Sequence, residues 1–155
     1  MRSVRPVRND GVVGSLSAAA ALRLPVRSHG AQVGHPVDVL LEPETWRAVG
    51  FVVHCGDDAR RMLPYVAGQA DETEIAVDSA LMLLDDVGFY RDRSESLRGL
   101  LGAEVGHDRR SAGVVRDVLL GPGGVATSLE VERDGELVRI DPDGATVSSP
   151  RASAA

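Results

Sequence analysis

The chain contains the same pattern twice, at a fixed spacing of 79 residues. Residues 38–53 read DVLLEPETWRAVGFVV, and residues 117–131 read DVLLGPGGVATSLEV. Shifting the sequence by 79 positions also aligns glycine, proline and aliphatic residues from about Leu22 to Gly56 with the second half, without a gap. These residue types form turns and buried positions, so we expect two structural units of similar fold.

Each copy predicts short β-strands. Residues 33–41 and 48–54 flank a Pro-containing turn and form a predicted hairpin, in which Pro36 requires an edge position or a bulge. In the second copy, apolar and polar residues alternate through 127–132, which is the period of a strand with one buried face. Further strands are expected at 62–66, 74–77, 137–140 and 145–148, and short helices at 79–85 and 94–102.

Composition limits the classes of function. Hydrophobic residues make up 43% of the chain but aromatic residues only 3%, so the core must be aliphatic. The net charge of -6 makes direct nucleic-acid binding unfavourable, because such binding depends on basic surface. All basic residues are arginine, which excludes phosphate loops and Schiff bases that need lysine. Cys55 is the single cysteine, so no intramolecular disulfide forms.

Domain organisation follows from the spacing. We predict a first unit at 15–88, a second unit at 92–148, a linker within 85–93, and flexible termini at 1–14 and 149–155. Arginines near the start precede an apolar stretch, as in a secretion signal, but Asn9 and Asp10 interrupt the pattern. No segment reaches the roughly 18 apolar residues that span a bilayer. We therefore expect a cytoplasmic protein without a membrane span.

The repeated pattern resembles the PRC-barrel domain. This domain occurs in the cytoplasmic part of the photosynthetic reaction centre H subunit and at the C-terminus of the ribosome-maturation factor RimM. The resemblance covers most of residues 15–148 and implies an all-β fold, with two small antiparallel barrels in tandem and one or two short helices between them. It also implies an adaptor or assembly module without catalytic residues. The residues that carry it are Gly34, Asp38, Val39, Leu40, Pro43, Thr45, Val49, Gly50, Val52, Val53, Leu63 and Pro64, and more weakly Gly113, Asp117, Val118, Leu119, Pro122, Leu129 and Val131.

Searches for catalytic and metal-binding patterns give no candidate. His54 and Cys55 are adjacent, but neighbours on a strand point to opposite faces, so they are poorly placed as a catalytic pair, and Cys55 is expected to be buried. The DPDG segment at 141–144 lacks the later ligands of a calcium loop. We predict no catalytic, cofactor-binding or metal-ligating residues, no cofactor, and a protein that is not an enzyme.

The two copies differ in the strand after the turn. The spacing of 79 aligns Val49, Phe51 and Val53 with Ser128, Glu130 and Glu132. On this alignment the first copy is apolar on both faces of the strand, and something must cover the extra face. The chain itself, a second copy in a homodimer, or a partner protein anchored by Trp46 are the alternatives. The predicted interaction face comprises Trp46, Val49, Phe51 and Val53.

These observations predict a non-enzymatic adaptor that binds another protein or itself. The alternative is a ribosome- or RNA-maturation-associated factor resembling RimM. An acidic chain of this kind would bind a basic ribosomal protein rather than RNA directly.

Overall fold

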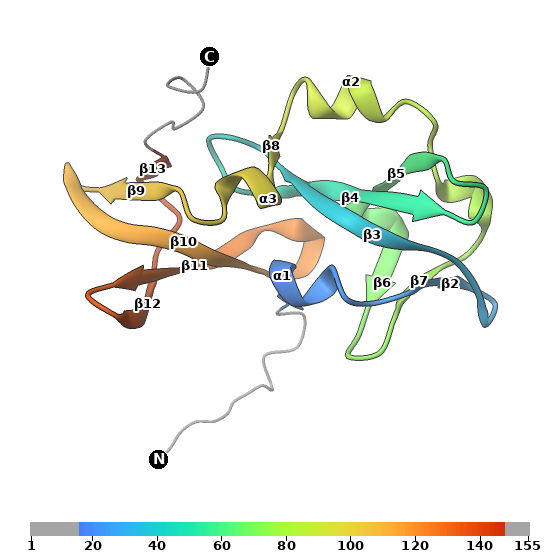
Figure 1. Ribbon diagram of the computed structural model, residues 1–155, viewed down its shortest axis with the longest axis horizontal. Coiled ribbons are helices and arrows are strands. Elements are labelled where there is room, and N and C mark those ends of the chain that lie inside the picture. Colours follow the sequence, from blue (N-terminus) through green and yellow to red (C-terminus); the bar gives the residue numbers. More distant parts are fainter. Residues whose placement is uncertain (1–15, 148–155) are drawn as a thin grey trace.

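The computed structural model describes residues 16–147, so the predicted flexible termini at 1–14 and 149–155 lie outside the described residues. Of the described residues, 52% lie in strands and 17% in helices. The chain is therefore mostly β, as predicted. The strands form two sheets, one of which curls into a half-barrel, and Figure 1 shows them side by side.

The first sheet is built mainly from the first copy. Its strands run in the order β5-β4-β3-β2-β7-β6, and β8 also pairs with β3. All neighbours are antiparallel except β2 and β7, which are parallel. The strands are β2 (Val26–Ser28), β3 (Ala31–Leu41), β4 (Ala48–Cys55), β5 (Arg60–Pro64), β6 (Gly68–Ala70), β7 (Ile75–Val77) and β8 (Glu95–Ser96). The predicted β3–β4 hairpin is confirmed, and the pairing shifts between Pro36 and Asp38, which is the predicted bulge.

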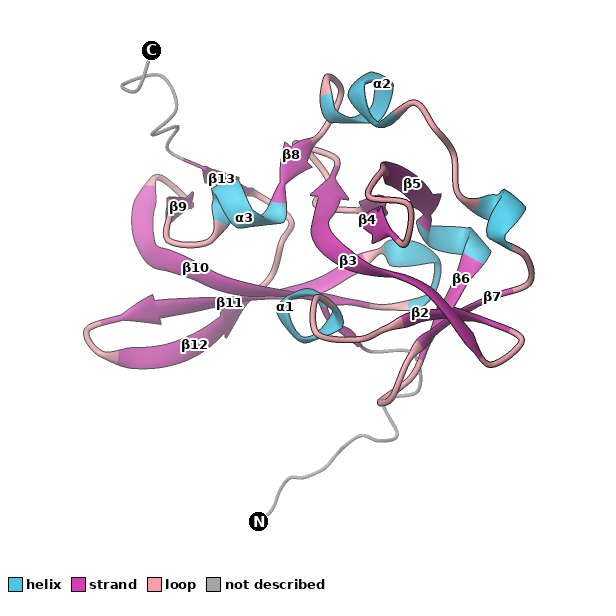
Figure 2. Ribbon diagram, turned by 45° about the vertical axis from the view of Figure 1, so that its right-hand side comes forward, coloured by secondary structure: helices cyan, strands magenta, loops and turns pink. Residues whose placement is uncertain are grey.

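The second sheet is built mainly from the second copy. Its order is β12-β11-β10-β9-β13, all antiparallel, and β1 also pairs with β10. Figure 2 shows the long β10–β11–β12 ribbon of this sheet. The strands are β1 (Leu16–Ser17), β9 (Glu104–His107), β10 (Arg110–Leu120), β11 (Ala126–Arg133), β12 (Glu136–Ile140) and β13 (Ala145–Val147).

The helices are all short. The two expected at 79–85 and 94–102 are present as η3 and α3, and the expected linker at 85–93 contains a third, α2. The α-helices are α1 (Ala18–Ala21), α2 (Val87–Arg91) and α3 (Leu97–Leu100), and the 3-10 turns are η2 (Tyr65–Ala67), η3 (Ala80–Met82) and η4 (Pro122–Gly124).

The two copies exchange their first elements. Strand β1 and helix α1 come from the first copy, but β1 pairs with β10 of the second sheet. Strand β8 and helix α3 lie 79 positions later, and β8 pairs with β3 of the first sheet. The repeat therefore extends back to residue 16, and each unit is completed by a segment of the other (Figure 1).

A buried aspartate holds each exchanged segment. Asp38, 4% exposed, accepts hydrogen bonds from the Ser96 hydroxyl and from the Arg98 amide at 3.2 Å. Ser96 in turn caps α3, because its oxygen accepts from the Gly99 amide. Asp38 also accepts from the Val39 amide at 2.9 Å, so several donors satisfy this buried carboxylate.

The second copy repeats this arrangement. Asp117, 9% exposed, accepts from the Ser17 hydroxyl, from the Ala19 amide at 2.9 Å and from the Val118 amide at 2.8 Å. Ser17 caps α1 by accepting from the Ala20 amide. Each of these residues lies 79 positions before or after its counterpart. The two sets of hydrogen bonds, which we call the Asp38 latch and the Asp117 latch, are therefore equivalent.

The spacing of 79 does not continue past the turn, and the alignment predicted for β4 and β11 was wrong by one residue. Val39 lies opposite Phe51, whereas Val118, 79 positions later, lies opposite Leu129, only 78 positions after Phe51. The reason is the turn. In the first copy the Glu42 amide bonds to the Arg47 carbonyl, and in the second copy Gly121 bonds to Val125, which closes a turn one residue shorter.

Candidate functional site

The predicted interaction face is largely inside the molecule. Trp46, Phe51 and Val53 are 2%, 1% and 0% exposed, and Val49 is half-buried. Phe51 stacks on Tyr65, with ring centroids 5.7 Å apart. Phe51 and Val53 belong to one core to which both sheets contribute, so the chain itself covers them.

A bulge separates Val49 from its expected neighbours. Leu41 pairs with Ala48 and Leu40 pairs with Gly50, so Val49 is the extra residue in the ladder. Ala48 consequently joins the shared core, and Val49 packs against a second, smaller cluster. Trp46 lines one pocket together with residues of the other sheet, and Phe51 lines another.

The extra apolar face of the first copy is the one that carries Val52. Leu40, Val52 and Met62 form the smaller cluster and are 0–1% exposed. Val87 and Tyr90 of α2 pack on this cluster. An ion pair also ties α2 to the sheet, since the guanidinium of Arg91 lies 3.6 Å from the Asp38 carboxylate.

The second copy has charges at the same positions. Glu130 lies opposite Asp117 as Val52 lies opposite the equivalent Asp38. Arg139 lies opposite Glu130 as Met62 lies opposite Val52. The side chains of Glu130 and Arg139 form an ion pair at 3.8 Å, and the Arg139 side chain is 66% exposed. The two copies therefore differ in the polarity of this strand. The difference lies on the face that carries Val52, not on the face that carries Phe51 and Val53.

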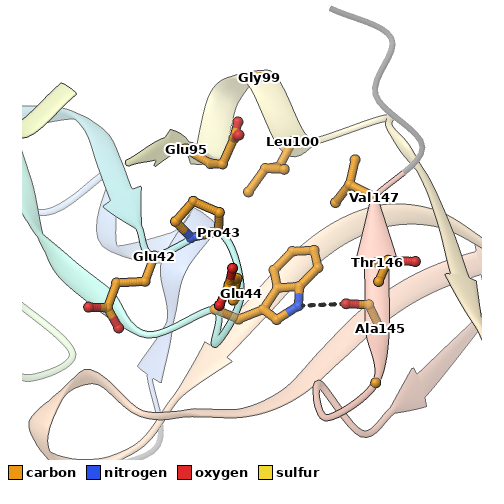
Figure 3. Close-up of a pocket in the computed structure, with 11 residues that line it drawn as sticks. Glu42, Pro43, Glu44, Glu95, Gly99, Leu100, Ala145, Thr146 and Val147 are labelled. Carbon is orange, nitrogen blue, oxygen red and sulfur yellow. Dashed lines mark hydrogen bonds between the residues drawn. The ribbon is translucent and has the colours of Figure 1, made fainter. Parts of the chain in front are cut away.

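An acidic pocket lies where the two sheets meet (Figure 3). It has a volume of about 350 Å³, within the range of about 300–1,000 Å³ typical of ligand sites. The β3–β4 turn, the β8–α3 segment and β13 form its walls, so both copies contribute. The lining residues are Glu42, Pro43, Glu44, Trp46, Glu95, Gly99, Leu100, Gly144, Ala145, Thr146 and Val147.

Trp46 forms the bridge between the two copies at this pocket. Its indole N–H donates to the Ala145 carbonyl of β13 at 3.2 Å, drawn as the dashed line in Figure 3. Its backbone has a φ of 64°, a left-handed conformation that is unfavourable for a bulky residue. In the corresponding turn of the second copy, glycines adopt positive φ at Gly123 and Gly124. The indole contacts offset a backbone conformation that glycine would adopt more easily.

The pocket combines an apolar floor with negative charge. Trp46, Leu100 and Ala145 are buried, whereas Glu42 and Glu44 are exposed and Glu95 is half-buried. Thr45 donates its hydroxyl to the Glu42 carboxylate at 2.8 Å. None of the described residues that line the pocket is basic. Such a site suits a side chain with a cationic end and an apolar stem.

The Asp38 latch positions one wall of the pocket. It holds Ser96, which is flanked by Glu95 and by α3 with Gly99 and Leu100. The sequence prediction missed this wall because it began the repeat at Leu22. The recurring Ser and Asp positions on both sides of the 79-residue spacing were the signal that could have found it.

A second pocket occupies the corresponding place in the other half. It has a volume of about 570 Å³. Leu16, Ala20, Gly121 and Pro122 line it, at the positions that Glu95, Gly99, Glu42 and Pro43 occupy in the first pocket. Two of the glutamates of the acidic pocket are thus replaced by leucine and glycine.

This second pocket carries acids elsewhere on its wall, at Asp71 and Glu72. Hydrogen bonds from the Thr73 amide and hydroxyl and the Glu74 amide lower the pKa of Asp71, so it stays ionised. The two pockets share their construction but differ in where the negative charge lies.

Other reactive groups are separate from both pockets. Cys55 is 5% exposed, as predicted, and the His54 ring nitrogen Nε2 forms a hydrogen bond of 2.9 Å with the Asp58 carboxylate. Within residues 16–147, no three His, Cys, Asp or Glu side chains are grouped as a metal site would require. In that part of the chain no helix is long and apolar enough to cross a membrane.

Neither the family models nor the curated proteins searched include a match to this chain.

Proposed function

We propose that this chain is a non-enzymatic adaptor, built from two PRC-like barrels, that binds another protein through the acidic pocket. The observation that carries the proposal is the pocket itself, which has a buried apolar floor and three glutamates among its lining residues. A basic segment of a partner protein complements it. Carboxylates at the mouth would bind a guanidinium or ammonium group, and the floor around Trp46 and Leu100 would accept the aliphatic stem.

The Trp46 backbone supports the same reading. An unfavourable φ at a non-glycine residue is retained where the surrounding contacts outweigh it, and such positions gather at binding sites. Tryptophan is also frequent among residues that dominate binding energies. Since both copies form the walls, the pocket exists only when the two units are docked together.

Binding to a partner tests the proposal. The wild-type chain, a triple variant with Glu42→Gln, Glu44→Gln and Glu95→Gln, and a control with Asp78→Asn, Asp92→Asn and Asp134→Asn at exposed positions are used as baits in native lysate. The two triple variants change the net charge equally, but only the first alters the pocket. Captured proteins are identified by mass spectrometry, purified, and titrated against each bait by calorimetry.

We expect a basic partner whose affinity falls at least about tenfold, or about 1.4 kcal/mol, with the pocket variant and little with the control. Equal losses for the two variants would contradict the proposal, as would a partner that prefers the neutralised pocket. Ribosomal proteins among the purified binders would favour the alternative, a ribosome-maturation role resembling that of RimM.

A further inference from the structure

Strand β12 has a free outer edge in the described structure. It is the end strand of the second sheet and pairs only with β11 there. Arg139 occupies the place that Met62 has in β5, because each lies opposite the equivalent residue of the preceding strand. The backbone N–H and C=O of Met62 point away from β4. The backbone N–H and C=O of Arg139 therefore point away from β11. The same holds for Leu137, because every second residue of a strand has the same orientation.

The first sheet closes the corresponding edge. Met62 exchanges two backbone hydrogen bonds of 2.7 Å with Leu84, a residue from the segment after η3. Pro64, two residues further on, also lies at an outward position and has no N–H to offer. A paired residue and a proline are both ways to protect a sheet edge. The fold therefore has an occupant for this edge in one copy and none, among residues 16–147, in the other.

The free edge carries neither of these two protective features. Strand β12, with the sequence ELVRI, contains no proline, and the side chain of Leu137 on it is 61% exposed. Its one acid, Glu136, and one base, Arg139, balance each other, although the whole chain carries a net charge of -6. Among surfaces of this acidic chain, such a neutral edge can approach an identical edge without strong repulsion.

We infer that β12 is a self-association edge, at which two copies of this chain pair in antiparallel orientation around Val138. In this register Leu137 lies opposite Arg139 of the second copy, and both residues offer outward N–H and C=O groups for the ladder. The aliphatic stem of that arginine then covers Leu137, and the two Val138 residues meet on the two-fold axis. The inference is independent of the acidic pocket, which is formed by other strands.

Sedimentation equilibrium on the full chain tests the inference across micromolar to millimolar concentrations. We expect a mass that rises from the 16.4 kDa of the chain to twice that value. The informative variant is Leu137→Lys. In the monomer the new ammonium lies beside Glu132, directly across from position 137 on β11, so folding is preserved. In the dimer it faces Arg139 of the second copy, and the like charges repel.

The variant should weaken dimerisation at least tenfold, while the urea unfolding midpoint stays unchanged at micromolar concentrations where the chain is monomeric. Val125→Lys is the matched control, because Val125 is 54% exposed in the turn of the same sheet but lies off the edge. Leu137→Pro, which removes an outward N–H and the leucine side chain, should act like Leu137→Lys. A chain that is monomeric at every concentration overturns the inference. So does a dimer that Leu137→Lys leaves intact, including a dimer that Val125→Lys weakens equally.

Discussion

The two copies share the same arrangement of strands, but they differ in how many faces of the sheet are buried. In the first sheet, Val52 and Met62 lie under α2, and both sides of the β4 ladder are buried. In the second sheet, Glu130 and Arg139 occupy these positions as a partly exposed ion pair. A duplicated unit can thus acquire a second apolar face when another segment covers it, whereas an uncovered copy must keep that face polar.

The copies agree where they contact each other. Both buried aspartates bind the cap residue of the other copy's helix, and each exchanged strand pairs at the end of a long strand. Residues at the contact between the two copies must fit the same geometry in each copy. This explains why the Asp38 latch and the Asp117 latch are equivalent. The outer faces lack that requirement, so their chemistry differs.

The largest expected effect comes from exchanging the two outer faces. Val52→Glu places an unpaired carboxylate at a fully buried site, and we expect a loss of about 3–5 kcal/mol of unfolding free energy. Glu130→Val at the equivalent site should change it by less than about 1 kcal/mol, since it removes one member of an exposed pair. Urea denaturation monitored by circular dichroism measures both. Equal effects would show that the two faces are alike.

Shortening the side chain opposite Val52 or Glu130 extends the comparison of the two outer faces. Met62→Ala removes a side chain that is 0% exposed, and we expect a loss of about 2–5 kcal/mol through the cavity left behind. Arg139→Ala should stay within about 0.5 kcal/mol, as surface substitutions usually do. Thermal and urea unfolding curves provide the measurement. A loss of unfolding free energy for Arg139→Ala as large as that for Met62→Ala would contradict the difference between the two faces.

The latches should respond alike. Asp38→Ala and Asp117→Ala each leave a serine hydroxyl and backbone amides without their acceptor, and each should cost about 1–3 kcal/mol. Urea unfolding gives the cost, and hydrogen exchange shows where protection is lost. Faster exchange in α3 should follow only Asp38→Ala, and in α1 only Asp117→Ala. If either substitution loosens both helices, the latches do not act separately.

The smallest effect concerns the β4–β5 turn. Two hydrogen bonds from Arg61, of 3.0 and 2.8 Å, lower the pKa of the Asp57 carboxyl from 3.8 to about 2. Because the folded pKa is the lower one, the stabilisation is present above about pH 4 and is lost as the pH falls through about 2. In the second copy, Asp134 and Gly135 close the equivalent turn and both have positive φ values, whereas in the first copy Asp58 has a positive φ.

Carboxyl NMR titration tests this prediction. In Arg61→Gln, the pKa of Asp57 should return toward 3.8, and the small stability difference from the wild type should vanish near pH 2. An unchanged pKa in the variant would show that Arg61 is not the cause.

Much of the fold could be predicted from residue types. Glycine, proline and the aliphatic pattern located the β3–β4 hairpin, the bulge at Pro36 and the buried Cys55. The candidate site was harder to predict. Trp46 was singled out as the anchor for a partner protein, but its pocket depends on Glu95 and Val147, which are remote in the sequence.

Two expectations changed for specific physical reasons. A turn shortened by one residue shifted the register, and in a strand a shift of one residue moves every side chain to the other face. A second shift at Val49 then separated it from Phe51 and Val53. Neither event leaves a periodic signal in the sequence, because both arise from hydrogen bonds across the ladder.

The sequence by itself determined that there are two copies, that they are β-structured, and that one strand of the first is apolar on both sides. These are local properties, carried by the period of the side chains and by turn-forming residues. Only the tertiary structure decided which copy each segment completes and what covers the extra face. Those outcomes depend on contacts between residues distant in the chain, such as Ser17 with Asp117 and Ser96 with Asp38.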